Sequence, residues 1–132
     1  MKTIRKIIAE LGDIDEWAGG HTKIPNDPYM PLLIEHLGKG PCKGDLIAVS
    51  HTYVQNGDLM RDPEIVFLVT EDIWTPVSFR NDSLGIYQEA LVIEDGRIRY
   101  VRPKLIRDLK RFARDWDRNI AAQGYLRVIT GP

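Results

Sequence analysis

The chain has 132 residues, of which 43% are hydrophobic, and a formal net charge of -1, values typical of a single globular domain over residues 1–132. No apolar run approaches the ~20 residues that span a bilayer, and the basic start lacks the apolar block of a signal peptide. The one cysteine, Cys42, excludes an internal disulfide, so we expect a cytoplasmic protein.

Charge is distributed unevenly along the chain. Residues 1–96 carry 8 Lys and Arg against 16 Asp and Glu, whereas residues 97–132 carry 10 against 3. Such asymmetry indicates either charged partners or a basic helix that folds against an acidic remainder. The sequence leaves both interpretations open.

The first predicted element is a short amphipathic helix that Thr3 caps and Gly12 ends, because isoleucines recur at helical spacing between them. Residues 13–28 are punctuated by glycine and proline, so we expect an irregular segment that Trp17 holds to the core. A second short helix is predicted over Pro28–Leu37, with proline at its first position and glycine after its last.

Five strands are predicted next, and short connections favour an antiparallel meander over parallel crossovers. Pro76 places the third strand at an edge or a bulge, and the Asp95-Gly96 pair is the clearest hairpin signal. The predicted strands are approximately Asp45–Gln55, Glu64–Thr70, Trp74–Phe79, Gly85–Glu94 and Arg97–Val101.

The last large element is an amphipathic helix that begins at Pro103 and ends at Gly124. Tyr125–Thr130 would then form a tail or a short extra strand. Because the long helix should cover one face of the sheet, the predicted fold class is α+β with two layers. It comprises an antiparallel meander of about five strands, the long C-terminal helix and two short N-terminal helices.

The segment richest in chemically active side chains is residues 51–64. Its Asn56-Gly57 pair explains a turn, but it does not explain so many charges between two apolar runs. We expect a loop that forms a binding site, because function concentrates on loops held by a rigid sheet. The candidate residues within it are His51, Asp58, Arg61, Asp62 and Glu64.

Arg61 has two interpretations: it pairs locally with Asp62, or it presents its guanidinium to a phosphate or carboxylate ligand. His51 also has two. It either ends a core-facing row and bonds to the backbone, or it lies at the sheet rim opposite Glu64. The second reading allows a metal-dependent hydrolase or nuclease built from His51, Asp58, Asp62 and Glu64. We expect no cofactor and assign no metal ligands.

Further polar residues lie on the later strands. Arg80 ends the third strand, and Gln88 and Glu89 interrupt the apolar run of the fourth. If the strands meander in order, Gln88, Arg80, Glu64 and His51 would converge on one polar face, although that depends on register. We include these residues in the candidate binding site.

The final helix carries a set of cations outside its apolar stripe. Interleaved aspartates favour a solvated helix face, whereas clustered arginine also suits phosphate contacts, so nucleic-acid binding is the alternative. The residues that would make those contacts are Arg107, Lys110, Arg111, Arg114 and Arg118.

Three segments resemble a family of uncharacterised small domain proteins found in bacteria and on plasmids, conjugative elements and phages: SHTYVQNGDLMRDPEIVF, PVSFRNDSLGIYQEA and LKRFARDWDRNIAAQGY. The resemblance spans roughly residues 21–124 and is most specific at Gly57–Glu64 and Gln88–Ala90. It implies an accessory gene of a mobile element and supplies no known activity, cofactor or catalytic residue.

The leading hypothesis is therefore a non-enzymatic binding protein of a mobile element that interferes with a host system. It would hold a host protein or a small ligand through the 51–64 segment and the adjoining strand ends. No membrane association is expected.

Overall fold

Six consecutive strands form the main sheet of the computed structural model, which describes residues 1–12 and 20–131. Each strand pairs antiparallel with the next along the chain, as the meander prediction requires. The predicted role of Trp17 lies outside the described residues. In chain order the strands are β1 (His21–Asn26), β2 (Tyr29–Lys39), β3 (Asp45–Gln55), β4 (Asp58–Thr70), β5 (Ile73–Asn81) and β6 (Ile86–Glu89).

The second predicted helix, Pro28–Leu37, is wrong, because those residues belong to β2 and the turn before it. Leu32, Leu33 and Ile34 are all buried, and β2 lies between β1 and β3 in the sheet. A short continuous apolar run does not distinguish a buried strand from a helix. Pairing with β3, whose residues come later in the chain, decided that this segment is a strand.

The 51–64 segment is a hairpin rather than a loop. β3 and β4 run on through it and are joined by Asn56 and Gly57, which both have positive φ, at 52° and 84°. This is the backbone that a two-residue turn with Asn-Gly favours. β4 therefore begins six residues earlier than Glu64, its predicted start. A bulge opposite His51 holds Asp62 and Pro63.

The fourth predicted strand, Gly85–Glu94, is divided at Ala90 into β6 and β7 (Leu91–Glu94). Ala90 is fully buried, its N–H donates to Val77 and its carbonyl accepts from Arg102, so the chain leaves the first sheet there. β7 and β8 (Arg97–Val101) make a separate two-stranded sheet, and their Asp95-Gly96 turn is confirmed.

Pro76 lies where the β4–β5 register shifts, so the bulge prediction is confirmed. Two single-turn 3-10 helices connect strands: η3 (Pro41–Lys43) precedes β3 and η4 (Asp82–Leu84) precedes β6.

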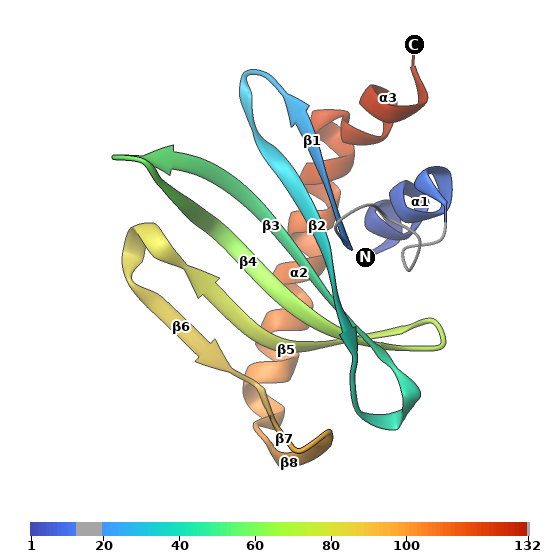
Figure 1. Ribbon diagram of the computed structural model, residues 1–132, viewed down its shortest axis with the longest axis vertical. Helices are drawn as coiled ribbons and strands as arrows, with labels where there is room; N and C mark the ends of the chain where they lie inside the picture. Colours follow the sequence, from blue (N-terminus) through green and yellow to red (C-terminus); the bar gives the residue numbers. More distant parts are fainter. Residues whose placement is uncertain (13–19, 132) are drawn as a thin grey trace.

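The part of the chain that the structure describes also holds three α-helices: α1 (Lys2–Leu11), α2 (Pro103–Gln123) and α3 (Tyr125–Thr130). α2 begins at Pro103 and ends at Gly124, whose φ of 86° is left-handed, as the sequence predicts. Residues 125–130 form a short helix in place of the predicted tail or strand. Figure 1 shows α2 running behind the strands along one face of the sheet.

The core lies between that face and the helices. Its members include Ile34, Val49 and Phe67 from the sheet, Trp116 from α2 and Tyr125 from α3, all nearly inaccessible to solvent. The α+β class is thus confirmed, and within residues 1–12 and 20–131 the main sheet has six strands rather than five and one α-helix precedes it. Among the described residues, no helix is long and apolar enough to cross a membrane.

Candidate functional site

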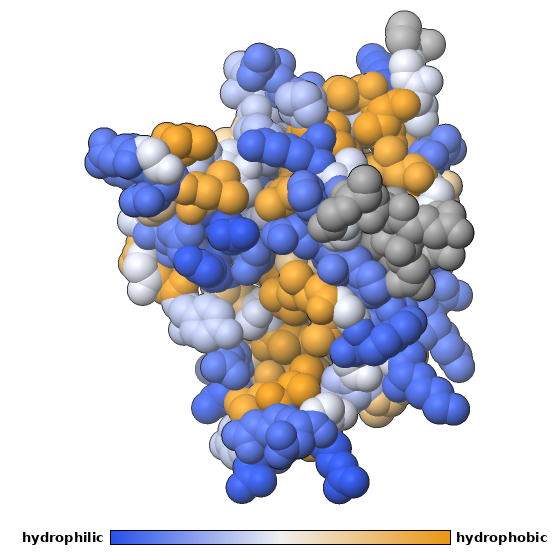
Figure 2. Space-filling view, viewed as in Figure 1, coloured by the Kyte–Doolittle hydropathy of each residue, from blue (hydrophilic) through white to orange (hydrophobic). Residues whose placement is uncertain are grey.

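Register defines the face of the sheet that points away from α2, which we call the distal face. Leu33 of β2, Ser50 of β3, Glu64 of β4, Arg80 of β5 and Tyr87 of β6 are successive cross-strand partners and so point the same way. No α-helix that the structure describes packs against this row. Figure 2 shows hydrophilic residues gathered over the middle of β3 and β4, with an apolar strip below them.

His51 points to the opposite face, into the core. It neighbours Ser50 along β3, and successive side chains of a strand alternate between faces. Its ring lies 5.5 Å from that of Trp116 and 5.6 Å from that of Tyr125, and the side chain is 7% exposed. Burial lowers the pKa of His51, against backbone hydrogen bonds at Pro31 and Met30 that favour the charged form. The core-facing interpretation is confirmed, and the predicted convergence with Glu64 is wrong.

Arg61 lies between two carboxylates on the distal face. Its Nε lies 2.8 Å from Oε2 of Glu64, and its Nη2 lies 3.7 Å from Oε1 of Glu35. The bulge in β4 explains this geometry: Arg61 and Glu64 are three residues apart yet point to the same face. All three side chains are no more than 26% exposed, so this ion-pair network is shielded from solvent far better than a surface pair.

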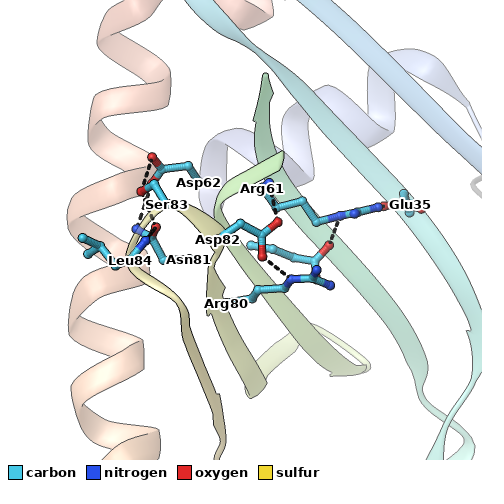
Figure 3. A network of polar contacts seen from close by, with 9 residues as sticks. Glu35, Arg61, Asp62, Arg80, Asn81, Asp82, Ser83 and Leu84 are labelled. Carbon is cyan, nitrogen blue, oxygen red and sulfur yellow. Dashed lines mark hydrogen bonds and ion pairs between the residues drawn. The ribbon is translucent and has the colours of Figure 1, made fainter. Parts of the chain in front are cut away.

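Asp82, from η4, extends the network toward the end of the sheet. One carboxylate oxygen accepts the backbone N–H of Arg61 at 2.8 Å, and the other accepts Nε of Arg80 at 2.6 Å. Figure 3 shows Glu35, Arg61, Arg80 and Asp82 in one continuous chain of contacts. The Arg80 side chain is 44% exposed, so its remaining N–H donors can reach a ligand.

Asp62 belongs to a second set of contacts beside the first (Figure 3). Its carboxylate accepts the Nδ2 amide of Asn81 at 2.8 Å and lies 3.1 Å from the Ser83 hydroxyl. Together the two sets tie the β4 bulge to the turn between β5 and β6. We call Glu35, Arg61, Glu64, Arg80 and Asp82 the distal cluster.

Carboxylates outnumber guanidinium groups in the distal cluster by three to two. Burial raises the pKa of Glu64, and the nearby Glu35 adds to that rise, against the attraction of Arg61. Burial also acts to raise the pKa of Asp82, but hydrogen bonds from Arg61 and Arg80 outweigh it, so the pKa lies below its usual value. The cluster is thus a preformed acidic site whose two cations are already paired.

The structure separates the other predicted site residues. Asp58 is exposed at the hairpin tip. Gln88 pairs with Phe79 and so points away from Arg80, whereas Glu89 pairs with Ser78 on the distal face. Within residues 1–12 and 20–131, no three His, Cys, Asp or Glu side chains form a group that suits a metal ion. His51, Asp58, Asp62 and Glu64 do not converge, and we build no function on that set.

Sequence reasoning missed Glu35 and Asp82. Glu35 was assigned to a helix, and only the β2–β3–β4 pairing brings it to Arg61. Asp82 had a usable signal, because Asn-Asp-Ser after a strand is typical of a capped turn, and Asn81 does accept the N–H of Leu84.

Apolar side chains flank the distal cluster at the hairpin tip. Val54 and Leu59 are cross-strand partners on the face of Arg61, and they are 68% and 41% exposed. Apolar surface is therefore exposed at this tip, next to the charges. Ser50 and Thr52, at the base of the cluster, are buried with hydroxyls that no described residue hydrogen-bonds.

The predicted cations of α2 occupy the opposite side of the molecule. At about 100° per residue, they fall within one outward arc of the helix, and all are exposed: Arg107, Lys110, Arg111, Arg114 and Arg118. Arg118 pairs with Asp115 at 2.6 Å, which supports the solvated-face interpretation for that residue.

The fold and the distal cluster together define a small α+β domain with an antiparallel sheet that is helix-covered on one face and carries a charged site on the other. Residues 2–126 match the family described as Domain of unknown function (DUF6908), and the chain belongs to that family. Neither the curated proteins nor the solved structures yielded a match. The association with mobile elements stays a prediction.

Proposed function

We propose that this chain is a non-enzymatic binding domain and that the distal face holds its partner. The observation that carries the proposal is the distal cluster itself: ionic side chains that are half-buried and fixed by mutual contacts on a face that no described α-helix covers. Side chains held in place before binding lose little conformational entropy when a partner docks.

The chemistry of this face favours a protein or peptide partner with a basic side chain among apolar ones. Three carboxylates against two guanidinium groups leave an acidic surplus, which attracts cations and repels acidic competitors. Val54 and Leu59 supply exposed apolar area beside it, and apolar area next to a charged centre is typical of protein interfaces.

Selection of random peptides displayed on phage tests the proposal. Peptides enriched on the immobilised protein should carry Lys or Arg next to apolar residues. The double variant Glu35→Gln and Glu64→Gln keeps the shape of the cluster and removes two charges. It should weaken the affinity for these peptides by about tenfold or more, which corresponds to ~1.4 kcal/mol.

The matched control is Glu94→Gln, which removes a carboxylate from the exposed ion pair with Arg99 on the small sheet. It should leave peptide affinity unchanged. Equal loss in both variants would indicate a long-range charge effect, and equal binding by the wild type and the Glu35/Glu64 variant would refute docking on the distal face.

Interference with a host system on behalf of a mobile element belongs to the same proposal and is supported by sequence resemblance alone. Genes for transfer or replication modules are then expected beside the gene for this chain. A consistent setting among housekeeping genes would contradict that part while leaving the binding face intact.

A further inference from the structure

A cavity of about 480 Å³ lies on the other side of the sheet, between α1, α2 and the ends of β4 and β5. The Arg5–Asp72 ion pair, at 3.1 Å, joins α1 to the β4–β5 turn. Small-molecule sites have volumes of roughly 300–1,000 Å³, so the cavity is large enough for a compact ligand. We call it the α1–α2 cavity.

One wall of the α1–α2 cavity is aromatic. Phe67 and Trp74 both line it, and their rings meet edge to face with centroids 5.3 Å apart. Phe67 is almost fully buried, whereas Trp74 keeps part of its surface accessible. A flat, apolar ligand group can pack against the exposed part of the indole, because aromatic faces bind such groups through dispersion and stacking.

The rim is cationic. Lys110, Arg114 and Arg118 line the cavity from successive turns of α2, and Lys2 joins them from α1. Arg118 is paired with Asp115, but Lys2, Lys110 and Arg114 make no ion pair with the residues that the structure describes. Three unpaired cations around one cavity repel one another, and an anion placed between them removes that repulsion.

Asp117 is the one carboxylate among the described lining residues, and it makes no ion pair with Lys110 or Arg114. Both of its oxygens lie 3.1 Å from the backbone nitrogen of Thr3, and one lies 3.4 Å from that of Ile4. Its charge is therefore directed at the first turn of α1, where a helix N-terminus favours an anion.

We propose that the α1–α2 cavity binds a nucleotide, with its phosphate held by Lys110, Arg114 and Lys2 and its base packed against Trp74. Lysine and arginine are the side chains that hold phosphate oxygens, and aromatic rings bind bases of any sequence. The site is independent of the distal face and goes beyond the function proposed above.

Two sources share this chemistry: a free mononucleotide, or one unit of a single strand that continues along the exposed cations of α2. Arg107 and Arg111 lie on the same outward arc of the helix, outside the cavity lining. A strand in the second case would contact them, and its affinity would fall steeply with salt as counterions are released.

Titration calorimetry with the full chain tests the site, using adenosine monophosphate, ribose 5-phosphate and a single-stranded oligonucleotide of about ten nucleotides. Adenosine monophosphate should bind about tenfold or more tightly than ribose 5-phosphate, because only the former has a base to stack. Lys110→Ala with Arg114→Ala should weaken both by about tenfold or more.

The matched control is Lys104→Ala with Arg107→Ala, which removes two cations of α2 that do not line the cavity and should leave mononucleotide affinity unchanged. Trp74→Leu should weaken the binding of adenosine monophosphate and leave the binding of ribose 5-phosphate unchanged. Melting curves of every variant separate lost binding from lost folding.

An oligonucleotide that binds more tightly than the mononucleotide, and is weakened by Arg111→Ala, identifies a strand as the source. Mononucleotide affinity at least as high identifies the free ligand. The proposal would be overturned if none of the three probes bound, or if adenosine monophosphate and ribose 5-phosphate bound with equal affinity. Unchanged affinity in the Lys110→Ala with Arg114→Ala variant would also overturn it.

Discussion

Asp117 caps α1 from another helix, and its removal should destabilise the protein through that contact. α1 has no side-chain cap of its own at Met1. The Asp117 carboxylate, 8% exposed, accepts the N–H of Thr3 at 3.1 Å and lies 3.4 Å from the nitrogen of Ile4. It therefore satisfies donors that the first turn of any helix leaves unpaired.

The magnitude follows from two bounds. Loss of a helix cap costs about 0.5–2 kcal/mol, and loss of a hydrogen bond to a charged group costs about 1.5–3 kcal/mol. Asp117→Ala should therefore lower the free energy of unfolding by about 1.5–3 kcal/mol. At roughly 3–5 °C per kcal/mol for a domain of this size, the melting temperature should fall by about 5–15 °C.

Thermal denaturation followed by circular dichroism, with urea unfolding as a second measurement, gives this number. The control is Asp115→Ala on the same helix, whose partner Arg118 is exposed, so the loss should be within ~0–1 kcal/mol. Hydrogen exchange adds a local readout: amides of α1 should lose protection before those of α2. Equal melting temperatures for the two variants would refute the capping argument.

Three further variants test the two faces of the sheet and one close contact. Burial raises the pKa of Glu64 above its ordinary 4.5, so the folded state holds the proton more tightly and stability is lost as pH rises from 4.5 through the folded pKa. The free energy of unfolding of Glu64→Gln, measured from pH 4.5 to 7, should lack this loss. Parallel pH dependence in the wild type and the variant would contradict this prediction. Burial lowers the pKa of His51 below 6.5, so the unfolded state takes up the proton first as pH falls, and stability falls below pH 6.5. His51→Gln should lose less stability on acidification, as measured by urea unfolding. The same loss of stability in the wild type and the variant would count against a neutral core histidine. A Cβ on Gly44 would lie 2.8 Å from the carbonyl oxygen of Val69, whereas one on Gly40 would meet only leucine side chains. In chemical denaturation, Gly44→Ala should therefore lower the free energy of unfolding by about 1–3 kcal/mol, and Gly40→Ala should lower it less. The reverse order would be inconsistent with the backbone clash.

Local signals predicted the elements that depend on local chemistry. Asn56-Gly57 and Asp95-Gly96 are turns because few other residues adopt positive φ at both positions without strain. α2 begins at Pro103 and ends at Gly124 for equally local reasons. The alternation of side chains along β3 also gave a core-facing position for His51 as one of two interpretations. These properties depend on residues that are near neighbours in the chain.

The candidate site was predicted only in part. Arg61, Asp62, Glu64 and Arg80 were identified from their positions, but their partners were not. Glu35 reaches Arg61 across β2, β3 and β4, and an apolar run of ambiguous period concealed that β2 is a strand. Asp82 joins through a turn whose orientation follows from the β5–β6 register.

The sequence by itself determined the turns, the long helix, the antiparallel meander and which segment carries the charges, because backbone conformation and hydrophobic period are local properties. Only the tertiary structure decided that Leu33 belongs to a strand, that a bulge places Arg61 and Glu64 on one face, and that His51 lies on the other. Those outcomes depend on register between strands, where a shift of one residue exchanges the two faces of a sheet. Pairing across the sheet is therefore what converts scattered charges into a site.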